Sequence, residues 1–368
     1  MCKSFSLPLT GCSREDTSDD AGECGSQSTL DMIFAPVGEL RNTKNDESDA
    51  EETYPELCSA AVEKTAAAAR KLGILTAAEI SSETGDQTEF SCGNFESVHL
   101  GYLAKLTVAK ASGADIAFIR DPGHLWEMRA AVMAARQAGI PVFVVLDTDD
   151  EGKTSSGTDL TAAVITLASL GASAVGISCS QGIQALTELL HEVFPHSEVP
   201  LIAQTDLGAV TQEELQALVY SGASVFIDTS GNISSRTIGY IKSHASYDGR
   251  YEKDSNAAAI DCEAFFLGDE LELSQPVECG YGLGDDLIDM DDENINSICV
   301  CLRSSDDASI LANSAGMSRL PVTVHTNDAT VLEAALRYFP GRLIVDSRCE
   351  IEKKTLTELA KQYGAIIY

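Results

Sequence analysis

The sequence predicts an α/β protein: a (β/α)8-type, TIM-like barrel followed by a smaller α/β unit. Short apolar runs, typical of strands buried on both faces, alternate with amphipathic helical stretches. Six such units follow one another from about residue 57, which favours a barrel over an open doubly wound sheet. The rhythm stops near residue 245 and resumes with fewer elements near residue 296.

The barrel is expected over residues 56–244. Its predicted strands are Leu75–Ile80, Asp115–Arg120, Val142–Asp147, Ala174–Cys179, Pro200–Thr205 and Ser224–Thr229. The predicted helices between them are Phe95–Ser112, Leu125–Gln137, Leu160–Leu170, Gly182–Phe194 and Gln212–Tyr220. Gly139, Gly171 and Gly222 each follow a predicted helix end, where a left-handed cap favours glycine.

Residues 1–55 are predicted to be a disordered, acidic tail with a candidate first strand at Met32–Val37. The first 30 residues are rich in Ser, Gly, Asp and Cys and show no apolar period. Within them, Leu9-Thr-Gly-Cys12 resembles a lipoprotein processing box, but the preceding stretch is too short and polar for a signal sequence. With one candidate strand here, an incomplete barrel, or one whose gap is filled from elsewhere, stays open.

The second half divides into a predicted acidic linker over 245–295 and a small α/β unit over 296–368. The unit's expected strands are Ile298–Leu302, Val322–His325, Leu343–Asp346 and Ala365–Tyr368. Its expected helices are Thr330–Tyr338 and Lys353–Tyr363. Cys299 and Cys301 alternate on one strand and share a face, for which core packing is the preferred interpretation over metal binding.

Charge and composition narrow the classes of partner. The chain has 368 residues and a formal net charge of -32, which disfavours nucleic acid and anionic membrane surfaces. No apolar run is long enough to span a bilayer. Eleven unpaired-looking cysteines indicate reduced thiols and not a disulfide framework, so we expect a cytoplasmic protein.

Chemistry is expected at the carboxyl ends of the barrel strands, which share one rim. Four strand ends offer a carboxylate, namely Glu79, Asp147, Asp206 and Asp228. Together they could hold a cationic substrate or a hard cation. The alternative, four solvated carboxylates in a very acidic protein, is the preferred interpretation.

Several segments together resemble the homocysteine S-methyltransferase family over roughly residues 60–243. They include Ala111-Ser-Gly-Ala-Asp-Ile-Ala-Phe-Ile119, Trp126-Glu-Met-Arg-Ala-Ala-Val132, Asp150-Glu-Gly-Lys-Thr154 and Leu170-Gly-Ala-Ser-Ala-Val-Gly-Ile-Ser-Cys179. The resemblance implies that Cys179 stands at the family's first zinc ligand. The preferred alternative is that Cys179 is a small buried side chain packed in the core. In that family three thiolates hold Zn²⁺ and leave a position for the sulfur of homocysteine, which attacks a methyl donor.

The resemblance fails at the other two zinc ligands. Where the family has Gly-Gly-Cys-Cys-Gly, this chain has Phe226-Ile-Asp-Thr-Ser-Gly231, so Thr229 and Ser230 replace the cysteines. Hydroxyls are poor zinc ligands, and one thiolate cannot supply a tight tetrahedral site, which makes zinc doubtful. Gly280, Gly282 and Gly284 do not form a dinucleotide fingerprint, so no nucleotide cofactor is indicated.

Two functions follow as hypotheses. The first is a methyltransferase-like protein of methionine or one-carbon metabolism that transfers a methyl group to a thiol, with Asp228 and Thr229 lining the mouth beside Cys179. The second is a non-catalytic small-ligand-binding or regulatory pseudoenzyme. A partner subunit or homo-oligomer is compatible with either.

The C-terminal unit has a fainter resemblance, to the start of the pterin-binding domain of cobalamin-dependent methionine synthase. The resemblance lies in the segment Thr326-Asn-Asp-Ala-Thr-Val-Leu-Glu-Ala-Ala-Leu336, and we infer no folate binding from it.

Overall fold

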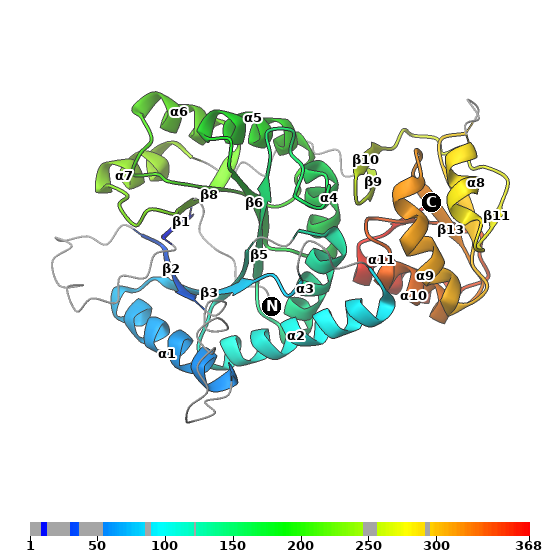
Figure 1. Ribbon diagram of the computed structural model, residues 1–368, viewed down its shortest axis with the longest axis horizontal. Helices are drawn as coiled ribbons and strands as arrows, with labels where there is room; N and C mark the ends of the chain where they lie inside the picture. The colour runs from blue at the N-terminus through cyan, green and yellow to red at the C-terminus, as the bar shows by residue number, and fades with distance from the viewer. Residues whose placement is uncertain are drawn as a thin grey trace.

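Eight parallel strands form a closed barrel, which confirms the predicted fold class (Figure 1). The computed structural model describes residues 9–12, 30–36, 54–84, 90–120, 123–245, 256–290 and 295–368. The barrel strands follow chain order around the ring: β1 Leu9–Cys12, β2 Met32–Pro36, β3 Leu75–Ser81, β4 Ile116–Arg120, β5 Val142–Thr148, β6 Ala174–Cys179, β7 Leu201–Thr205 and β8 Ala223–Asp228.

The ring is closed by a segment that the sequence places in a disordered tail. Strand β1 pairs in parallel with β8, with Cys12 opposite Asp228, and also with β2, with Cys12 opposite Ile33. The expectation of a tail is therefore wrong for Leu9–Cys12. These four residues gain their backbone hydrogen bonds from a neighbour on each side, so they need no apolar pattern of their own to form a strand.

Helices cover the outside of the barrel between successive strands. They are α1 Tyr54–Leu72, α2 Cys92–Ala111, α3 Leu125–Ala138, α4 Leu160–Leu170, α5 Ile183–Val193, α6 Gln212–Tyr220 and α7 Ser235–His244, with a 3-10 turn at Phe194–His196. Gly139 and Gly171 are left-handed caps with φ of 70° and 103°, as predicted. Thr211 and Glu214 form a capping box at the start of α6.

Alternate strand residues build two separate layers of apolar core. One layer fills the barrel and includes Met32, Ala77, Phe118, Phe143 and Ile202. The other layer consists of the intervening strand residues packed against the helices, and it continues into the C-terminal unit. A strand residue in the second layer therefore faces away from the barrel interior.

The stretch expected to be a linker is partly ordered. It contains the hairpin β9 Ala257–Ile260 and β10 Glu263–Phe266, the short strand β11 Val277–Glu278 and helix α8 Leu283–Asp289. The hairpin packs on α4, and Asp261 accepts a backbone hydrogen bond from Asp159 at 2.9 Å. Arg342 and Ala259 exchange backbone hydrogen bonds, so the hairpin contacts both units.

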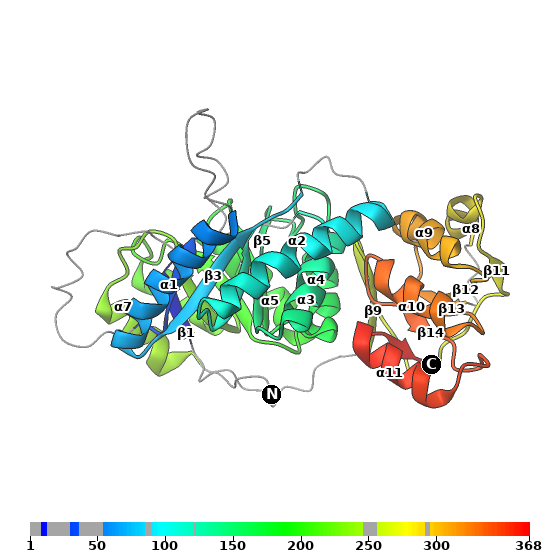
Figure 2. The same ribbon diagram turned by 90° about the horizontal axis from the view of Figure 1, so that it is seen from below.

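The C-terminal unit is a five-stranded parallel sheet beside the barrel (Figure 2). Its order is β11, β12 Ile298–Cys301, β13 Val322–His325, β14 Ile344–Val345 and β15 Ile366–Ile367, with helices α9 Ser305–Ser314, α10 Ala329–Tyr338 and α11 Lys353–Tyr363 and a 3-10 turn at Ala315–Met317. Among the described helices of both units, none is long and apolar enough to cross a membrane.

A buried arginine joins the two units. Arg129 on α3 is 1% exposed, and its guanidinium donates to the carbonyls of Leu336 at 2.6 Å and Arg337 at 3.3 Å, at the end of α10. Burial lowers the pKa of Arg129 to about 9. These carbonyls have no partner within the helix and carry the negative end of its dipole, so they are suitable acceptors for a cation.

Candidate functional site

Some of the predicted site residues have side chains that face the barrel mouth, and others have side chains that face the helices. Glu79 lies two residues after Ala77 on β3, and Asp147 lies two residues after Val145 on β5. Ala77 and Val145 belong to the core layer inside the barrel, so both carboxylates face the barrel mouth. Thr229, two residues beyond the inward-facing Ile227, is exposed at the same rim.

Arg120 lies between these two carboxylates. Its Nη1 donates to Glu79 Oε1 at 3.1 Å, and about half of the Arg120 side chain remains exposed. Burial raises the pKa of Asp147, while the nearby Arg120 charge opposes that rise. The mouth therefore presents one guanidinium between two carboxylates, a distribution suited to a ligand with both an acidic and a basic group.

Two polar residues that sequence reasoning missed extend this row. Strand register places Ser178 on β6 beside Asp147 and Gln204 on β7 beside Ser178. Gln204 is buried, and its Oε1 has no hydrogen-bond partner within the described residues. A buried carbonyl oxygen left unpaired is costly, so Gln204 offers an acceptor to a ligand at the floor of the mouth. In the sequence, the only signal for Ser178 and Gln204 is their position near the carboxyl ends of β6 and β7.

Cys179 faces away from this row. It alternates with Val175 and Ile177, which belong to the layer against the helices, and it packs against that layer itself. Its Sγ lies 3.6 Å from the carbonyl oxygen of Asp149. Burial raises the pKa of Cys179, as do the neighbouring carboxylates, so this thiol stays protonated near neutral pH.

Asp228 and Asp206 both stabilise loops, and Asp228 does not line the mouth. Asp228 is 0% exposed and accepts hydrogen bonds from the backbone N–H of Leu207 at 2.9 Å and from Ser230 Oγ at 3.0 Å. Asp206 is exposed and accepts from the backbone N–H of Gly208 at 3.0 Å. The expectation that all four carboxylates line one rim is therefore wrong for Asp228, because its position on β8 directs it outward.

The donor set at the mouth does not fit a zinc–thiolate site. Of the three positions at which the family has cysteine, this chain has Cys179, Thr229 and Ser230, and Ser230 donates to Asp228. Within the described part of the chain, no three His, Cys, Asp or Glu side chains are grouped so that they could share a metal ion. One thiol that packs against the helices cannot supply a tight tetrahedral site in the mouth.

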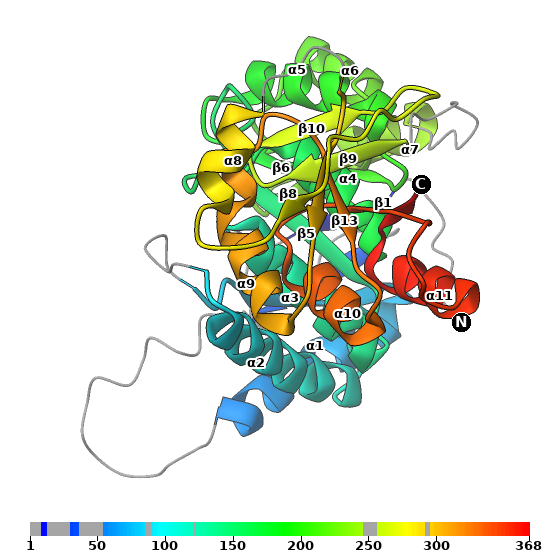
Figure 3. The same cartoon turned by 90° about the vertical axis from the view of Figure 1, so that its right-hand side faces the viewer.

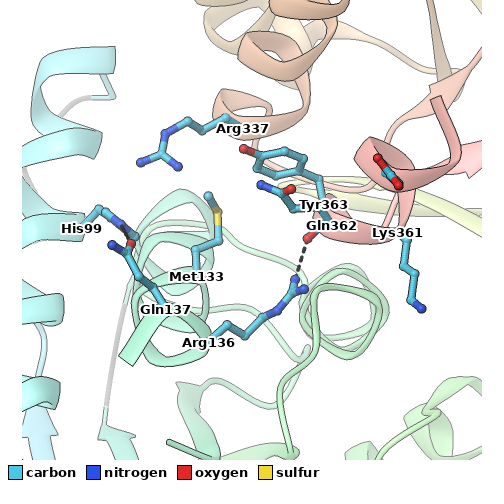
Figure 4. Close-up of a pocket in the computed structure, with 9 residues that line it drawn as sticks. His99, Met133, Arg136, Gln137, Arg337, Lys361, Gln362 and Tyr363 are labelled. Carbon is cyan, nitrogen blue, oxygen red and sulfur yellow. Dashed lines mark hydrogen bonds between the residues drawn. The ribbon is translucent and has the colours of Figure 1, made fainter. Parts of the chain in front are cut away.

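A second cavity, of 590 Å³, lies between the barrel and the C-terminal unit (Figure 4). Figure 4 shows Arg337 and Tyr363 from the C-terminal unit facing His99 and Gln137 from α2 and α3. His99 Nε2 and Gln137 Oε1 are 3.1 Å apart, and Arg337 donates to both carboxylate oxygens of Glu96. The Arg337–Glu96 pair joins the two units beside this cavity, which therefore belongs to their junction.

Most of the barrel matches the sequence profile of a known protein family. A sequence profile described as homocysteine S-methyltransferase matches residues 37–233, more than half of the chain. The methionine synthase of Mycobacterium leprae (strain TN) is 29% identical over 102 residues, which are 26% of this chain and 8% of that protein. The methionine synthase of Mycobacterium tuberculosis (strain H37Rv) is 26% identical over 102 residues, and 9% of its length is covered. The chain thus matches only a small part of these relatives.

Among solved structures, the apo form of the homocysteine methyltransferase MmuM from Escherichia coli is similar with a TM-score of 0.47 and 16% identity, over 64% of this chain and 95% of that one. The metallated form of the same enzyme has a TM-score of 0.48 and 15% identity over the same shares. The match of the family profile is the finding that assigns the family. From its extent, we conclude that this chain belongs to the homocysteine S-methyltransferase family.

Proposed function

We propose that the barrel mouth binds a small zwitterionic thiol and that the chain takes part in methyl transfer to that thiol, in methionine or one-carbon metabolism. The observation that carries the proposal is the inward-facing trio of Glu79, Arg120 and Asp147. A guanidinium recognises a carboxylate, and carboxylates recognise an ammonium group, so an amino acid has complementary charges for this trio.

The chain's own residues would orient the acceptor. Arg120 would hold the ligand carboxylate with the donors that Glu79 does not use, while Asp147 faces the ammonium group. The unpaired Gln204 Oε1 and the Ser178 hydroxyl, in register beside Asp147, would accept and donate hydrogen bonds deeper in the mouth. In the reaction, the thiol releases its proton to solvent, and its sulfur forms a bond to the methyl carbon of a sulfonium donor. The bond between that carbon and the donor sulfur breaks, and the donor leaves as a neutral thioether.

The binding experiment is calorimetry with homocysteine. We expect Arg120→Gln to weaken binding by at least tenfold, since it removes a charge-assisted contact. Arg136→Gln, an arginine of the junction cavity, is the matched control and should bind as the wild type does. Equal affinities for wild type and Arg120→Gln would exclude the proposed role of this mouth.

A second function is favoured by Thr229, Ser230 and the outward direction of Cys179. A barrel with these residues could bind the same ligand without catalysis, as a regulatory module for a partner subunit or within a homo-oligomer. Mass spectrometry of homocysteine after incubation with a methyl sulfonium donor distinguishes the two, because only the enzyme yields methionine.

An independent experiment measures the zinc bound per chain after anaerobic purification, in the wild type and in Cys179→Ser. It tests whether another ligand set has replaced the cysteine pair.

A further inference from the structure

The carboxyl ends of β12, β13 and β14 form a second polar site in the C-terminal unit, the part of the molecule that faces the viewer in Figure 3. A cavity of 650 Å³ lies at these ends, and its walls include Leu271, Leu273, Cys301, His325 and Asp346. Open parallel sheets bind ligands at this edge, where side chains from neighbouring strands converge. This cavity is separate from the barrel mouth.

Strand register places a thiol, an imidazole and a carboxylate side by side. Cys301 on β12 is paired with His325 on β13. The next pair along β13 and β14 brings Asp346 beside His325, where His325 Nδ1 and Asp346 Oδ2 are 3.0 Å apart. Since paired strands lie about 4.8 Å apart and paired residues share a face, the Cys301 thiol and the His325 imidazole occupy neighbouring positions on one face of the sheet.

Asp346 is held so that it can orient His325. It is 3% exposed and accepts hydrogen bonds from Arg348 Nε at 2.8 Å and from the Arg348 backbone N–H at 3.0 Å. Burial alone would raise the pKa of Asp346, but the hydrogen bonds from Arg348 and His325 hold it below its usual value. An ionised Asp346 favours a proton on His325 Nδ1, which leaves Nε2 free to act as a base.

The two thiols of β12 have different environments. Cys299 is 3% exposed, and burial raises its pKa to about 11. Cys301 is partly exposed at the cavity wall, and its pKa is raised by burial and by the Glu278 carboxylate, with Arg303 opposing. Cys301 is therefore a neutral thiol at rest, and it needs a neighbouring base to become a nucleophile.

We propose that Cys301, His325 and Asp346 form a nucleophilic site for acyl groups carried as esters or thioesters. In the step, a bond forms between Cys301 Sγ and the acyl carbon while the thiol proton moves to His325 Nε2. The carbon–oxygen or carbon–sulfur bond of the substrate then breaks, and the departing alcohol or thiol takes the proton from His325. The product is an S-acyl Cys301, which water hydrolyses to the free acid.

The test uses the full chain and 4-nitrophenyl acetate, with nitrophenolate release followed optically and the acetylated residue located by peptide mass spectrometry. We expect one acetyl group on Cys301 and a rate about 100-fold lower in His325→Gln, because general-base help is lost. Asp346→Asn should lower the rate through a wrongly oriented imidazole. Cys262→Ala should react as the wild type does, since Cys262 is an exposed thiol that does not line this cavity.

Results of three kinds would overturn the proposal: acetylation shared equally with the exposed Cys262, a Cys301 rate unchanged in His325→Gln, or no faster reaction than in the urea-unfolded chain. Circular dichroism of each variant checks folding. Should a variant not fold, the wild-type measurement of which cysteine is acetylated, and how fast relative to the unfolded chain, still decides the outcome.

Discussion

The barrel mouth and the edge of the C-terminal sheet are both built from the carboxyl ends of parallel strands, yet they present different chemistry. In the barrel, the inward positions carry Glu79, Arg120 and Asp147, while the thiol of Cys179 faces the helices. In the C-terminal unit, Cys301 and His325 share a register position and a cavity. The same fold element thus yields an ionic site or a nucleophilic one, depending on which residue falls on the accessible face.

The largest effect is expected where the two regions meet. Arg129→Ala should lower the free energy of unfolding by about 3 kcal/mol, because two helix-end carbonyls lose their donor and a large buried side chain leaves a void. Urea unfolding followed by circular dichroism measures the loss. Lys361→Ala, an exposed lysine at the same junction, is the control, and a loss no greater than that of the control would show that Arg129 does not join the units.

A smaller effect separates the two aspartates that accept hydrogen bonds from loop residues, one buried and one exposed. Asp228→Ala should cost about 2 kcal/mol of stability, since the buried N–H of Leu207 and the Ser230 hydroxyl lose their acceptor. Asp206→Ala, at an exposed turn, should cost less than about 1 kcal/mol. Thermal denaturation of the two variants compares them directly. Equal losses would contradict the outward, structural position of Asp228.

Two adjacent residues on β6, Ser178 and Cys179, test which side chains of this strand face the barrel mouth. Ser178→Val removes an inward hydroxyl and should weaken homocysteine binding about tenfold, the value of one good hydrogen bond. Cys179→Ser changes an outward side chain and should leave the affinity within about twofold. Calorimetry on both variants gives the comparison, and the reverse order of effects would place the thiol in the mouth.

The smallest effect is electrostatic. Arg120→Gln should raise the pKa of Asp147 further, because the charge that opposes the effect of burial is removed. When the pKa of a group is higher in the folded than in the unfolded protein, its contribution to stability depends on pH. That contribution is complete at pH values below the unfolded-state pKa, and it is lost as the pH rises through the folded-state pKa. Carboxyl-carbon NMR titration of both proteins measures the shift, and a lower pKa in the variant would contradict this assignment.

Much of the fold could be predicted because apolar runs that alternate with amphipathic stretches can be recognised in the sequence without knowledge of the tertiary contacts. The predicted strands from Leu75 to Thr229 all correspond to observed strands, within a few residues. Strand β1 could not be found in this way. It consists of four residues with a glycine and no apolar period, and its two neighbours lie elsewhere in the sequence.

The site was harder to predict than the fold. Barrel strands are apolar on both faces, so the pattern around Ile177, Ser178 and Cys179 does not say which residue points inward. The strand ends therefore predicted the correct set of neighbours but not their direction. Asp228 was assigned to the wrong side, while Cys179 packs against the helices, the alternative preferred to a functional thiol. The pairing of Cys301 with His325 needs the strand register, which only the assembled sheet supplies.

Strand β1 also has a consequence for how the chain is made. Leu9 pairs with Val225, so β1 is synthesised about 220 residues before its partner strand β8. Until β8 is made, β1 cannot form this pairing. At roughly 5–20 residues per second, that delay is on the order of ten to forty seconds. During this interval the edges of β2 and of the strands that follow lack their final closure, and contacts of such long sequence separation also slow refolding. The newly made chain is therefore expected to need protection from other open sheet edges until β8 has left the ribosome.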